Sequence, residues 1–338
     1  MLSEKIYTKE YLRQLRNQTK ADPSILERVI FAFGLLEAIS KTGLPFYFKG
    51  GSSLMLLLEK PRRLSTDIDI LVEPGTDIDH CIREAGKIFP FSDVTENIRI
   101  GKNNIEKRHF RFRCLSLVSG RELTILLDVV FEKPYYLSTV EKPIRNSLLL
   151  NEGTDLLVKM SEVNSLLGDK LTAFAPHTTG IPFGTGKELE VIKQFFDCAV
   201  LFDSMTDLKE VKECYERSVK NETGYRKLNA TKEEVLTDSI RGCACIASRG
   251  KYGNEYSYYK TGISGIRNHI INGSLTGETA GALACRVMYL FALILSDQST
   301  MKENVNAKTF SERKPELLPS KWFYISSYGR SGSICVPD

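Results

Sequence analysis

The sequence has 338 residues, which is enough chain for two domains with sizeable buried cores. Its composition, with 42% hydrophobic and 26% charged residues, is typical of a globular protein and excludes a disordered, collagen-like or small disulfide-stapled chain. Residues 1–150 carry 23 Lys and Arg against 19 Asp and Glu, so the whole formal net charge of +4 lies in the first half. A surplus this small permits an anionic ligand but does not establish nucleic-acid binding.

The sequence predicts neither a targeting segment nor a membrane span. The N-terminal MLSEKIYTKEYL lacks the apolar region of a signal peptide. The longest apolar run, Val287 to Leu295, is much shorter than the roughly 20 residues that a membrane-spanning helix needs. The eight cysteines show no CxxC pair, and Cys243 and Cys245 have no His or Cys at zinc-finger spacing. We therefore expect buried reduced thiols, a cytoplasmic protein and no membrane partner.

The first half alternates between helical and strand patterns. A helix is predicted to begin at Pro23, with Ser24 and Glu27 at capping-box spacing, and to end at Gly43. The elements expected after it are a strand at 45–48, a buried helix at 54–58, a strand at 67–72, a helix at 77–89, and a hairpin of strands 109–118 and 123–131. This order indicates a mixed sheet with helices packed on it.

After about residue 150 the pattern becomes helical. The predicted helices lie at 156–174, 188–202, 208–219, 232–247 and 279–296, with a flexible loop at 176–187. The last forty residues show no single pattern. We predict an α+β protein with two domains. Residues 1–150 form a mixed-sheet core that includes N-terminal helices, and residues 151–338 form a mainly helical domain.

The most informative stretch has Gly50-Gly51-Ser52, then fourteen intervening residues, and then Asp67-Ile68-Asp69. Side chains alternate along a strand, so Asp67 and Asp69 are expected to point to one side, about 6–7 Å apart, where both can bind one divalent cation. The two glycines and Ser52 stand where a strand turns into a helix, and such a turn offers unpaired N–H groups to a phosphate. Together they predict a site for a nucleoside triphosphate.

A third carboxylate, Asp128, lies in the run from Thr124 to Phe131. That run is apolar on both faces, which predicts a central strand with Asp128 buried. A buried charge needs a cation or a partner, and the role of third ligand in a two-metal site meets that need. Asp128 is also a candidate to take the proton of an attacking hydroxyl. The alternative is a strand-end Asp that caps a turn or pairs with an Arg.

Five segments together resemble the AbiEii/AbiGii-type toxin nucleotidyltransferase family, within the polymerase-beta-like superfamily. In chain order they are Lys49 to Ser52, Leu64 to Asp69, Leu127-Asp128, Gly168 to Ala173, and Lys193 to Asp197. The resemblance implies a mixed-sheet nucleotidyltransferase core with a helical domain, an NTP substrate, Mg²⁺ or alternatively Mn²⁺, and a cognate antitoxin. One position departs from the family pattern, because Gln194 stands where the family often has Asp.

The resemblance also assigns residues in the second half. It makes Lys170 the cation that meets the triphosphate as a point charge, although a helical Lys is usually solvated. Asp197 is flanked by apolar residues, so we expect it to be buried behind the site with Lys193 and to orient Lys170 or a metal-bound water. The alternative is that Lys193 and Asp197 simply pair at i,i+4. Substitution of a cleft-facing Lys170 is expected to leave stability nearly unchanged.

A basic strand face is the candidate surface for the acceptor. Three basic residues alternate with two aromatic ones: His109, Arg111 and Arg113 with Phe110 and Phe112. Arg111 and Arg113 are the predicted contacts to acceptor phosphates, with a merely solvated strand face as the alternative.

The combined prediction is Mg²⁺-dependent transfer of a nucleoside monophosphate from an NTP to a hydroxyl, with release of pyrophosphate. The predicted roles are triphosphate binding by Gly50, Gly51, Ser52 and Lys170, metal binding by Asp67, Asp69 and Asp128, and activation of the hydroxyl by Asp128. The resemblance implies the 3′ end of tRNA as acceptor and a toxin paired with an antitoxin. The alternatives are a small acceptor such as an aminoglycoside, a protein acceptor, or a non-catalytic nucleotide-binding module.

Overall fold

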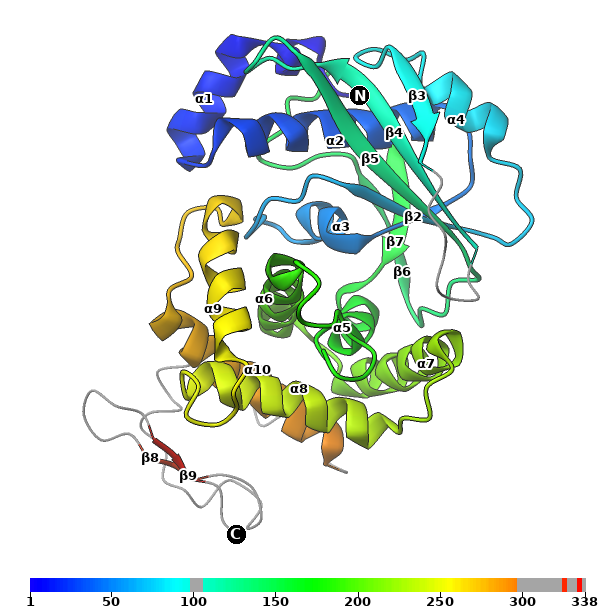
Figure 1. Cartoon of the computed structure of the whole chain (residues 1–338). Helices are drawn as coiled ribbons and strands as arrows, with labels where there is room; N and C mark the ends of the chain where they lie inside the picture. The colour runs from blue at the N-terminus through cyan, green and yellow to red at the C-terminus, as the bar shows by residue number, and fades with distance from the viewer. Residues whose placement is uncertain (98–105, 297–323, 327–332, 336–338) are drawn as a thin grey trace. The chain divides into compact units, whose positions relative to one another are not determined.

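A seven-stranded mixed sheet organises the first half of the chain in the computed structural model, which describes residues 1–97, 106–296, 324–326 and 333–335 (Figure 1). The strand order is β3-β4-β5-β2-β1-β7-β6. The pairs β2–β5 and β1–β7 are parallel, and the other pairs are antiparallel. The strands are β1 Tyr47–Lys49, β2 Ile68–Val72, β3 Asp93–Glu96, β4 Lys107–Leu115, β5 Glu122–Phe131, β6 Thr139–Pro143 and β7 Leu157–Ser161.

The chain divides into two compact units. One comprises Met1–Leu166 with Arg267–Ser274, and the other comprises Leu167–Ile266 with Leu275–Asp338. The first unit holds the sheet and the helices η1 Glu4–Tyr7, α1 Lys9–Thr19, α2 Pro23–Lys41, α3 Gly50–Leu57 and α4 Asp79–Ala85. The long, largely buried helix α2 packs against β2 and β5, so one face of the sheet forms the core of this unit. The predicted α+β class is confirmed.

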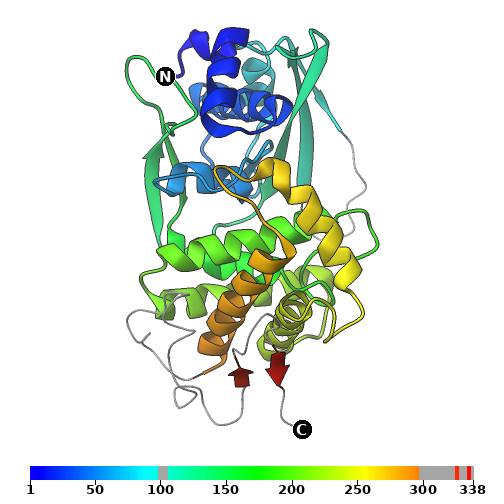
Figure 2. The same cartoon turned by 90° about the vertical axis from the view of Figure 1, so that its left-hand side faces the viewer.

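Helices dominate the second unit. They are α5 Val163–Ala173, which begins in the first unit, α6 Glu188–Ser204, α7 Leu208–Arg226, α8 Lys232–Ala247, α9 Tyr256–Gly265, η2 Ile266–His269, which runs on into the first unit, and α10 Gly277–Leu295. Helix α10 packs against α8 and α6, and α6 packs against α9 (Figure 2). The backbone also pairs β8 Tyr324–Ser326 with β9 Ser333–Cys335, while most of the last forty residues lie outside the described part.

Within the described part of the chain, α10 is long and apolar enough to cross a membrane by length and composition. Core helices of soluble proteins share this length and composition. A capping box of Thr276 and Thr279 begins α10.

The start of α2 differs from the prediction. Asp22, not Ser24, caps the helix, because its side chain accepts a hydrogen bond from the backbone N–H of Ser24, and Pro23 occupies the first turn. Glu27 takes no part in a capping box. It is buried, and its carboxylate accepts hydrogen bonds from the Ser116 hydroxyl and from the backbone N–H groups of the next two residues in the β4–β5 turn.

The predicted helix at 156–174 is wrong in its first part. Residues Leu157–Ser161 form strand β7, and α5 begins only at Val163. The local reason is a short alternation, because Val158 and Met160 are buried while Leu157 and Lys159 are exposed. The parallel partner β1 supplies the long-range pairing that this short segment needs.

Candidate active site

The register of four neighbouring strands places four charged or ionisable residues in one row across the sheet. His109 on β4 lies opposite Asp128 on β5, Asp128 is aligned with Asp69 on β2, and Asp69 lies opposite Lys49 at the end of β1. Register partners point to the same face of a sheet, so the four side chains share one face. It is the face opposite the core, because the neighbours of Asp69 and Asp128 along their strands, such as Ile68 and Leu127, are fully buried.

Asp128 is held by a hydrogen bond to His109. The distance from His109 Nδ1 to Asp128 Oδ1 is 2.6 Å. An ionised carboxylate only accepts hydrogen bonds, so the Nδ1–H of His109 is the donor. The prediction that Asp128 is buried is wrong, since its side chain is 36% exposed. The reason is that only the odd-numbered residues of β5 face the core, while the even-numbered residues, Asp128 among them, are half-buried or exposed.

The glycine turn lies directly against Asp69. Gly50 is the first residue of α3, directly after β1, as the sequence predicts, and its φ of +78° is readily adopted only by glycine. A Cβ atom at this position would overlap the carboxylate of Asp69. The open side of Gly50 is therefore filled by the carboxylate of Asp69, which fixes the glycine turn and a candidate metal ligand side by side.

Ser52 has a structural partner that the sequence did not indicate. It is fully buried, and its hydroxyl donates to the backbone carbonyl of Asp67, which ties α3 to the residue before β2. Because that hydrogen bond uses the only proton of the hydroxyl, Ser52 has to exchange partners before it can donate to a phosphate. Its predicted phosphate contact therefore stays a prediction.

Arg63 belongs to this turn, whereas the sequence indicated it only as one of the basic residues of the first half. Its side chain is buried, it donates from Nη1 to the Leu64 carbonyl at 3.2 Å, and a Cβ atom on Gly51 would lie 2.5 Å from its Nη2 and 2.8 Å from Ser65 Oγ. The guanidinium therefore sits at the first turn of α3. The residue type alone gave no signal, since an Arg in a polar stretch is usually exposed.

The carboxylates fit a magnesium ion that arrives with a nucleotide. Asp69 and Asp128 are register neighbours on one face and offer only oxygen ligands, and Asp67 is exposed just before β2. Among the described residues no group of three or more His, Cys, Asp or Glu is arranged to hold a metal by itself. Mg²⁺ usually takes one or two carboxylates together with substrate phosphates and water, so two aligned aspartates suit it. A three-carboxylate, two-metal site stays a prediction.

Lys170 belongs to the second unit and is buried, contrary to the expectation of a cleft-facing residue. Its Nζ on α5 lies 2.9 Å from Asp197 Oδ2 and 3.0 Å from Gln194 Oε1, both on α6. The two charged side chains are only 7% and 1% exposed. Asp197 is buried, as its apolar flanks predict, and it contacts Lys170, while Gln194 is the second partner of the ammonium. Lys193, the residue before Gln194 on α6, is half-buried.

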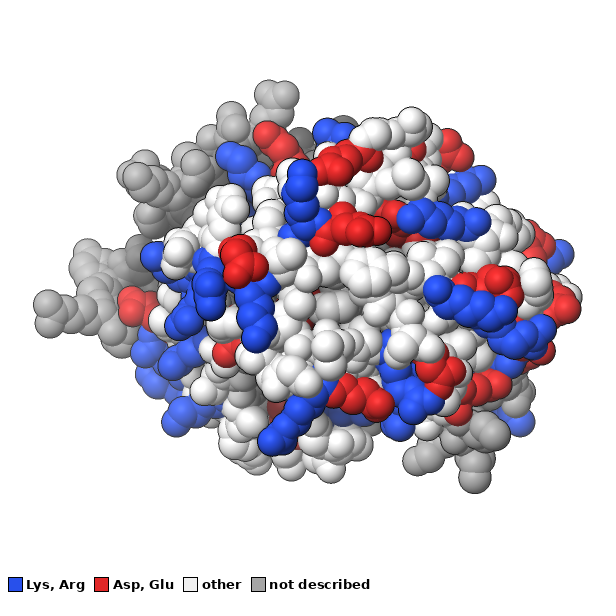
Figure 3. Space-filling model, turned by 90° about the horizontal axis from the view of Figure 1, so that it is seen from above, with Lys and Arg blue, Asp and Glu red and all other residues white. Residues whose placement is uncertain are grey.

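Strand β4 has the predicted basic face, and Arg111 and Arg113, the two predicted contacts to acceptor phosphates, differ in their surroundings. Phe110 and Phe112 are buried, so Arg111 and Arg113 share the face of His109. Arg113 forms ion pairs with Asp93 and Glu122. Arg111 is exposed and has no ion pair with the residues that the structure describes. Seen from above, described basic and acidic side chains are interleaved (Figure 3).

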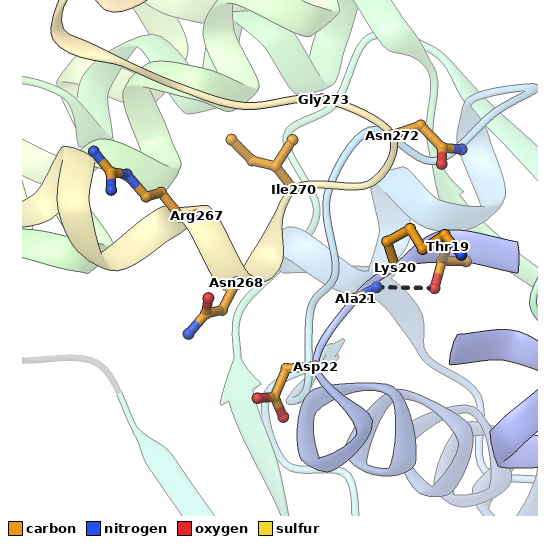
Figure 4. A pocket seen from close by; sticks show the side chains of 9 residues that line it. All are labelled: Thr19, Lys20, Ala21, Asp22, Arg267, Asn268, Ile270, Asn272 and Gly273. Carbon is orange, nitrogen blue, oxygen red and sulfur yellow. Dashed lines mark hydrogen bonds between the residues drawn. The ribbon is translucent and has the colours of Figure 1, made fainter. Parts of the chain in front are cut away.

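A cavity of about 260 Å³ lies elsewhere in the first unit, between the α1–α2 connection and the segment 267–273 (Figure 4). At its wall the backbone N–H of Ala21 donates a hydrogen bond to Thr19 Oγ1 at 3.3 Å, drawn as a dashed line in Figure 4. The predicted site residues are not among the nine that line it.

Comparisons with known proteins agree with the resemblance seen in the sequence. A family model described as the nucleotidyl transferase AbiEii toxin of a type IV toxin–antitoxin system matches residues 34–242. No curated protein sequence matches.

Solved structures give weaker likenesses. The structure of JHP933 from Helicobacter pylori has a TM-score of 0.45 and 13% identity, with 79% of this chain and 92% of that chain covered. A nucleotidyltransferase-like antigenic protein from Paracoccidioides brasiliensis has a TM-score of 0.38 and 16% identity, with coverage of 58% and 88%.

Proposed function

The chain belongs to the nucleotidyl transferase AbiEii toxin family of type IV toxin–antitoxin systems and is a nucleotidyltransferase, and we propose that it moves a nucleoside monophosphate from an NTP to the 3′ end of a tRNA with Mg²⁺. We propose in addition that it acts in the cytoplasm and that a cognate antitoxin restrains it. The small-molecule acceptor and the protein acceptor are the competing proposals.

One observation supports this reaction most directly, namely the alignment of Asp69 with Asp128 beside the Gly50 turn. Two carboxylates and a turn that begins a helix lie together at one sheet. A divalent ion there would neutralise charge on the triphosphate and orient it. The backbone of Gly50 and Gly51 would hold the phosphates, since the first N–H groups of a helix have no partners within it.

The remaining chemistry falls to Asp128. The acceptor hydroxyl oxygen attacks the α-phosphorus, the bond from that phosphorus to the bridging oxygen of pyrophosphate breaks, and the hydroxyl proton passes to the carboxylate of Asp128. One carboxylate oxygen of Asp128 is taken by His109, which leaves the other for this role. Lys170 stays the proposed cation for the triphosphate, with Asp197 and Gln194 fixing its ammonium.

The charge on β4 supports an RNA acceptor over an aminoglycoside. Arg111 is exposed on the face that also carries Asp128, and a polycationic drug would be repelled there, whereas an RNA phosphate would be attracted.

The test is label transfer. The protein is incubated with each labelled NTP, Mg²⁺ and total tRNA, and label on RNA is expected with at least one NTP. Asp69→Asn and Asp128→Asn should each abolish the signal while the protein stays folded, and Glu10→Gln on the exposed surface of α1 is the matched control. If folded protein transfers no label from any NTP, labels itself instead, or labels only an aminoglycoside in a parallel incubation, the tRNA proposal fails.

A further inference from the structure

We infer that His109 is a positioning residue of the reaction, which fixes the carboxylate of Asp128 so that one defined oxygen faces the reacting groups. This inference rests on the proposed function. His109 was set apart in the sequence only as part of a basic strand face, and its role follows from its place in the sheet.

The first step is geometric. His109 and Asp128 are direct register partners on antiparallel strands, so their side chains leave the sheet side by side on one face. The bond from Nδ1 to Oδ1 is 2.6 Å, shorter than a typical N–H···O bond of about 2.9 Å, as expected when the acceptor is ionised. The His109 ring is 18% exposed, so it is mostly held by its surroundings.

The second step concerns what Asp128 lacks without His109. Its side chain is 36% exposed, so packing alone does not fix the plane of its carboxylate. Its neighbour in the row on the other side is Asp69, and like charges directly opposite one another in a sheet repel. Repulsion between the two carboxylates would push Asp128 away from Asp69, and the hydrogen bond from His109 on the other side fixes the position it takes.

The third step is the choice of oxygen. His109 contacts Oδ1 of Asp128, and Oδ2 has no hydrogen-bond partner among the described residues. Oδ2 is therefore the oxygen available to a metal or to a hydroxyl proton. Partners that orient a ligating or catalytic group in this way typically contribute 10- to 100-fold in affinity or activity.

The fold does not depend on this bond. Strands β4 and β5 pair over their whole length through backbone hydrogen bonds, and Phe110 and Phe112 bury the other face of β4. Removal of the imidazole is therefore expected to change the reaction and not the folding, which separates a positioning role from a structural one.

The test compares two substitutions at one position. His109→Leu removes the donor and keeps an apolar side chain, while His109→Asn keeps an N–H close to the place of Nδ1. His80→Leu and His80→Asn, on the exposed surface of α4, are the matched controls. We expect His109→Leu to lower kcat about 10- to 100-fold with KM for the NTP changed less than about threefold, and His109→Asn to restore most of kcat. The unfolding temperature should stay that of the native protein in both.

A second readout does not need turnover. Mn²⁺ binding is followed by electron paramagnetic resonance in the presence of the α,β-methylene analogue of each NTP. His109→Leu should weaken Mn²⁺ binding about 10- to 100-fold, and His109→Asn should stay near the native value. If the native protein transfers no nucleotide, the proposed function fails and this titration still decides the inference. Native kcat and Mn²⁺ affinity in His109→Leu, or equal losses in both His109 variants, would overturn it.

Discussion

The carboxylate of Asp69 fills the space that a side chain on Gly50 would need. Gly50 begins α3, and Asp69 lies in β2 opposite Lys49, the last residue of β1. The glycine turn and Asp69 are therefore held in contact by the pairing of β1 with β2. The glycine is required twice, once for its φ of +78° and once for this contact.

Gly50→Ala should therefore be much more damaging than a glycine substitution that meets only one of these demands. Gly75 is the matched control, because its φ is +84° but a Cβ there has open space around it. Gly75→Ala should cost about 1–2 kcal/mol from the left-handed backbone alone. Gly50→Ala should cost about 1–3 kcal/mol more from the overlap, and should abolish transfer. Denaturant unfolding of both variants measures the difference, and equal losses would contradict the contact.

The buried pair of Lys170 and Asp197 makes a second prediction. Lys170→Ala leaves the Asp197 carboxylate buried without its main cation, so unfolding should cost about 3–5 kcal/mol less than in the native protein. The double variant Lys170→Met with Asp197→Leu should recover much of that loss, because it removes both charges.

An exposed ion pair on a neighbouring helix provides the control for this experiment. Arg217 and Glu213 on α7 lie 2.7 Å apart, and both are about half exposed. Arg217→Ala should change stability by less than about 1 kcal/mol. If Lys170→Ala is as mild as Arg217→Ala, the pair does not contribute to the fold as its burial indicates.

Local patterns in the sequence predicted the parts of the site that depend on neighbours in the chain. The strand before Gly50, the helix after it and the DxD at the start of β2 follow from residue type and spacing. His109 was not recognised as a partner of Asp128, because the two residues lie nineteen positions apart and their contact depends on the register of β4 with β5. No single residue pattern encodes that register, which is set by the geometry of the turn between the two strands and by which residues of each strand are buried.

Burial was harder to predict than secondary structure, because it also depends on contacts with distant segments of the chain. The run around Asp128 is apolar on both faces, yet only one face meets the core. Glu27 looked like a helix-cap residue because its spacing from Ser24 suited one, but it is bound by a turn about ninety residues further along the chain. In both cases the deciding contact comes from a distant segment, which a local window does not contain.

The acceptor surface leads to a third prediction, in which Arg111 and Arg113 behave differently. Arg111→Ala should weaken RNA binding and reduce the slope of log affinity against log salt by about one, because one phosphate contact is lost. Arg113→Ala should also lower stability slightly, because Asp93 and Glu122 lose their partner. Arg83→Ala, at an exposed position of α4, is the control. RNA affinity is measured by fluorescence anisotropy over a range of salt, and an unchanged slope in Arg111→Ala excludes the contact.

The last prediction concerns His177, which follows α5 and joins two carboxylates of the second unit. Its Nδ1 lies 2.7 Å from Asp238 Oδ1 on α8, and its Nε2 lies 2.7 Å from Glu255 Oε1, the residue before α9. The Asp238 carboxylate also accepts from the His177 backbone N–H and the Thr178 hydroxyl, both at 2.9 Å. A ring that donates to two carboxylates at once must carry both protons, so the arrangement favours the charged imidazolium.

Burial of the ring lowers the pKa of His177, but the hydrogen bonds and the charges of Asp238 and Glu255 outweigh it and raise the pKa above its ordinary value. A pKa that is raised in the folded state stabilises the fold fully below the unfolded pKa of about 6.5, and the contribution is lost as the pH rises through the folded pKa. The ring is more than half exposed, so the effect is modest. His177→Gln should therefore destabilise the protein most near about pH 5.5 and least near about pH 8.5. Unfolding temperatures of the native protein, His177→Gln and the exposed control His80→Gln across that range measure the trend, and a His177→Gln deficit that grows with pH would contradict the charged bridge.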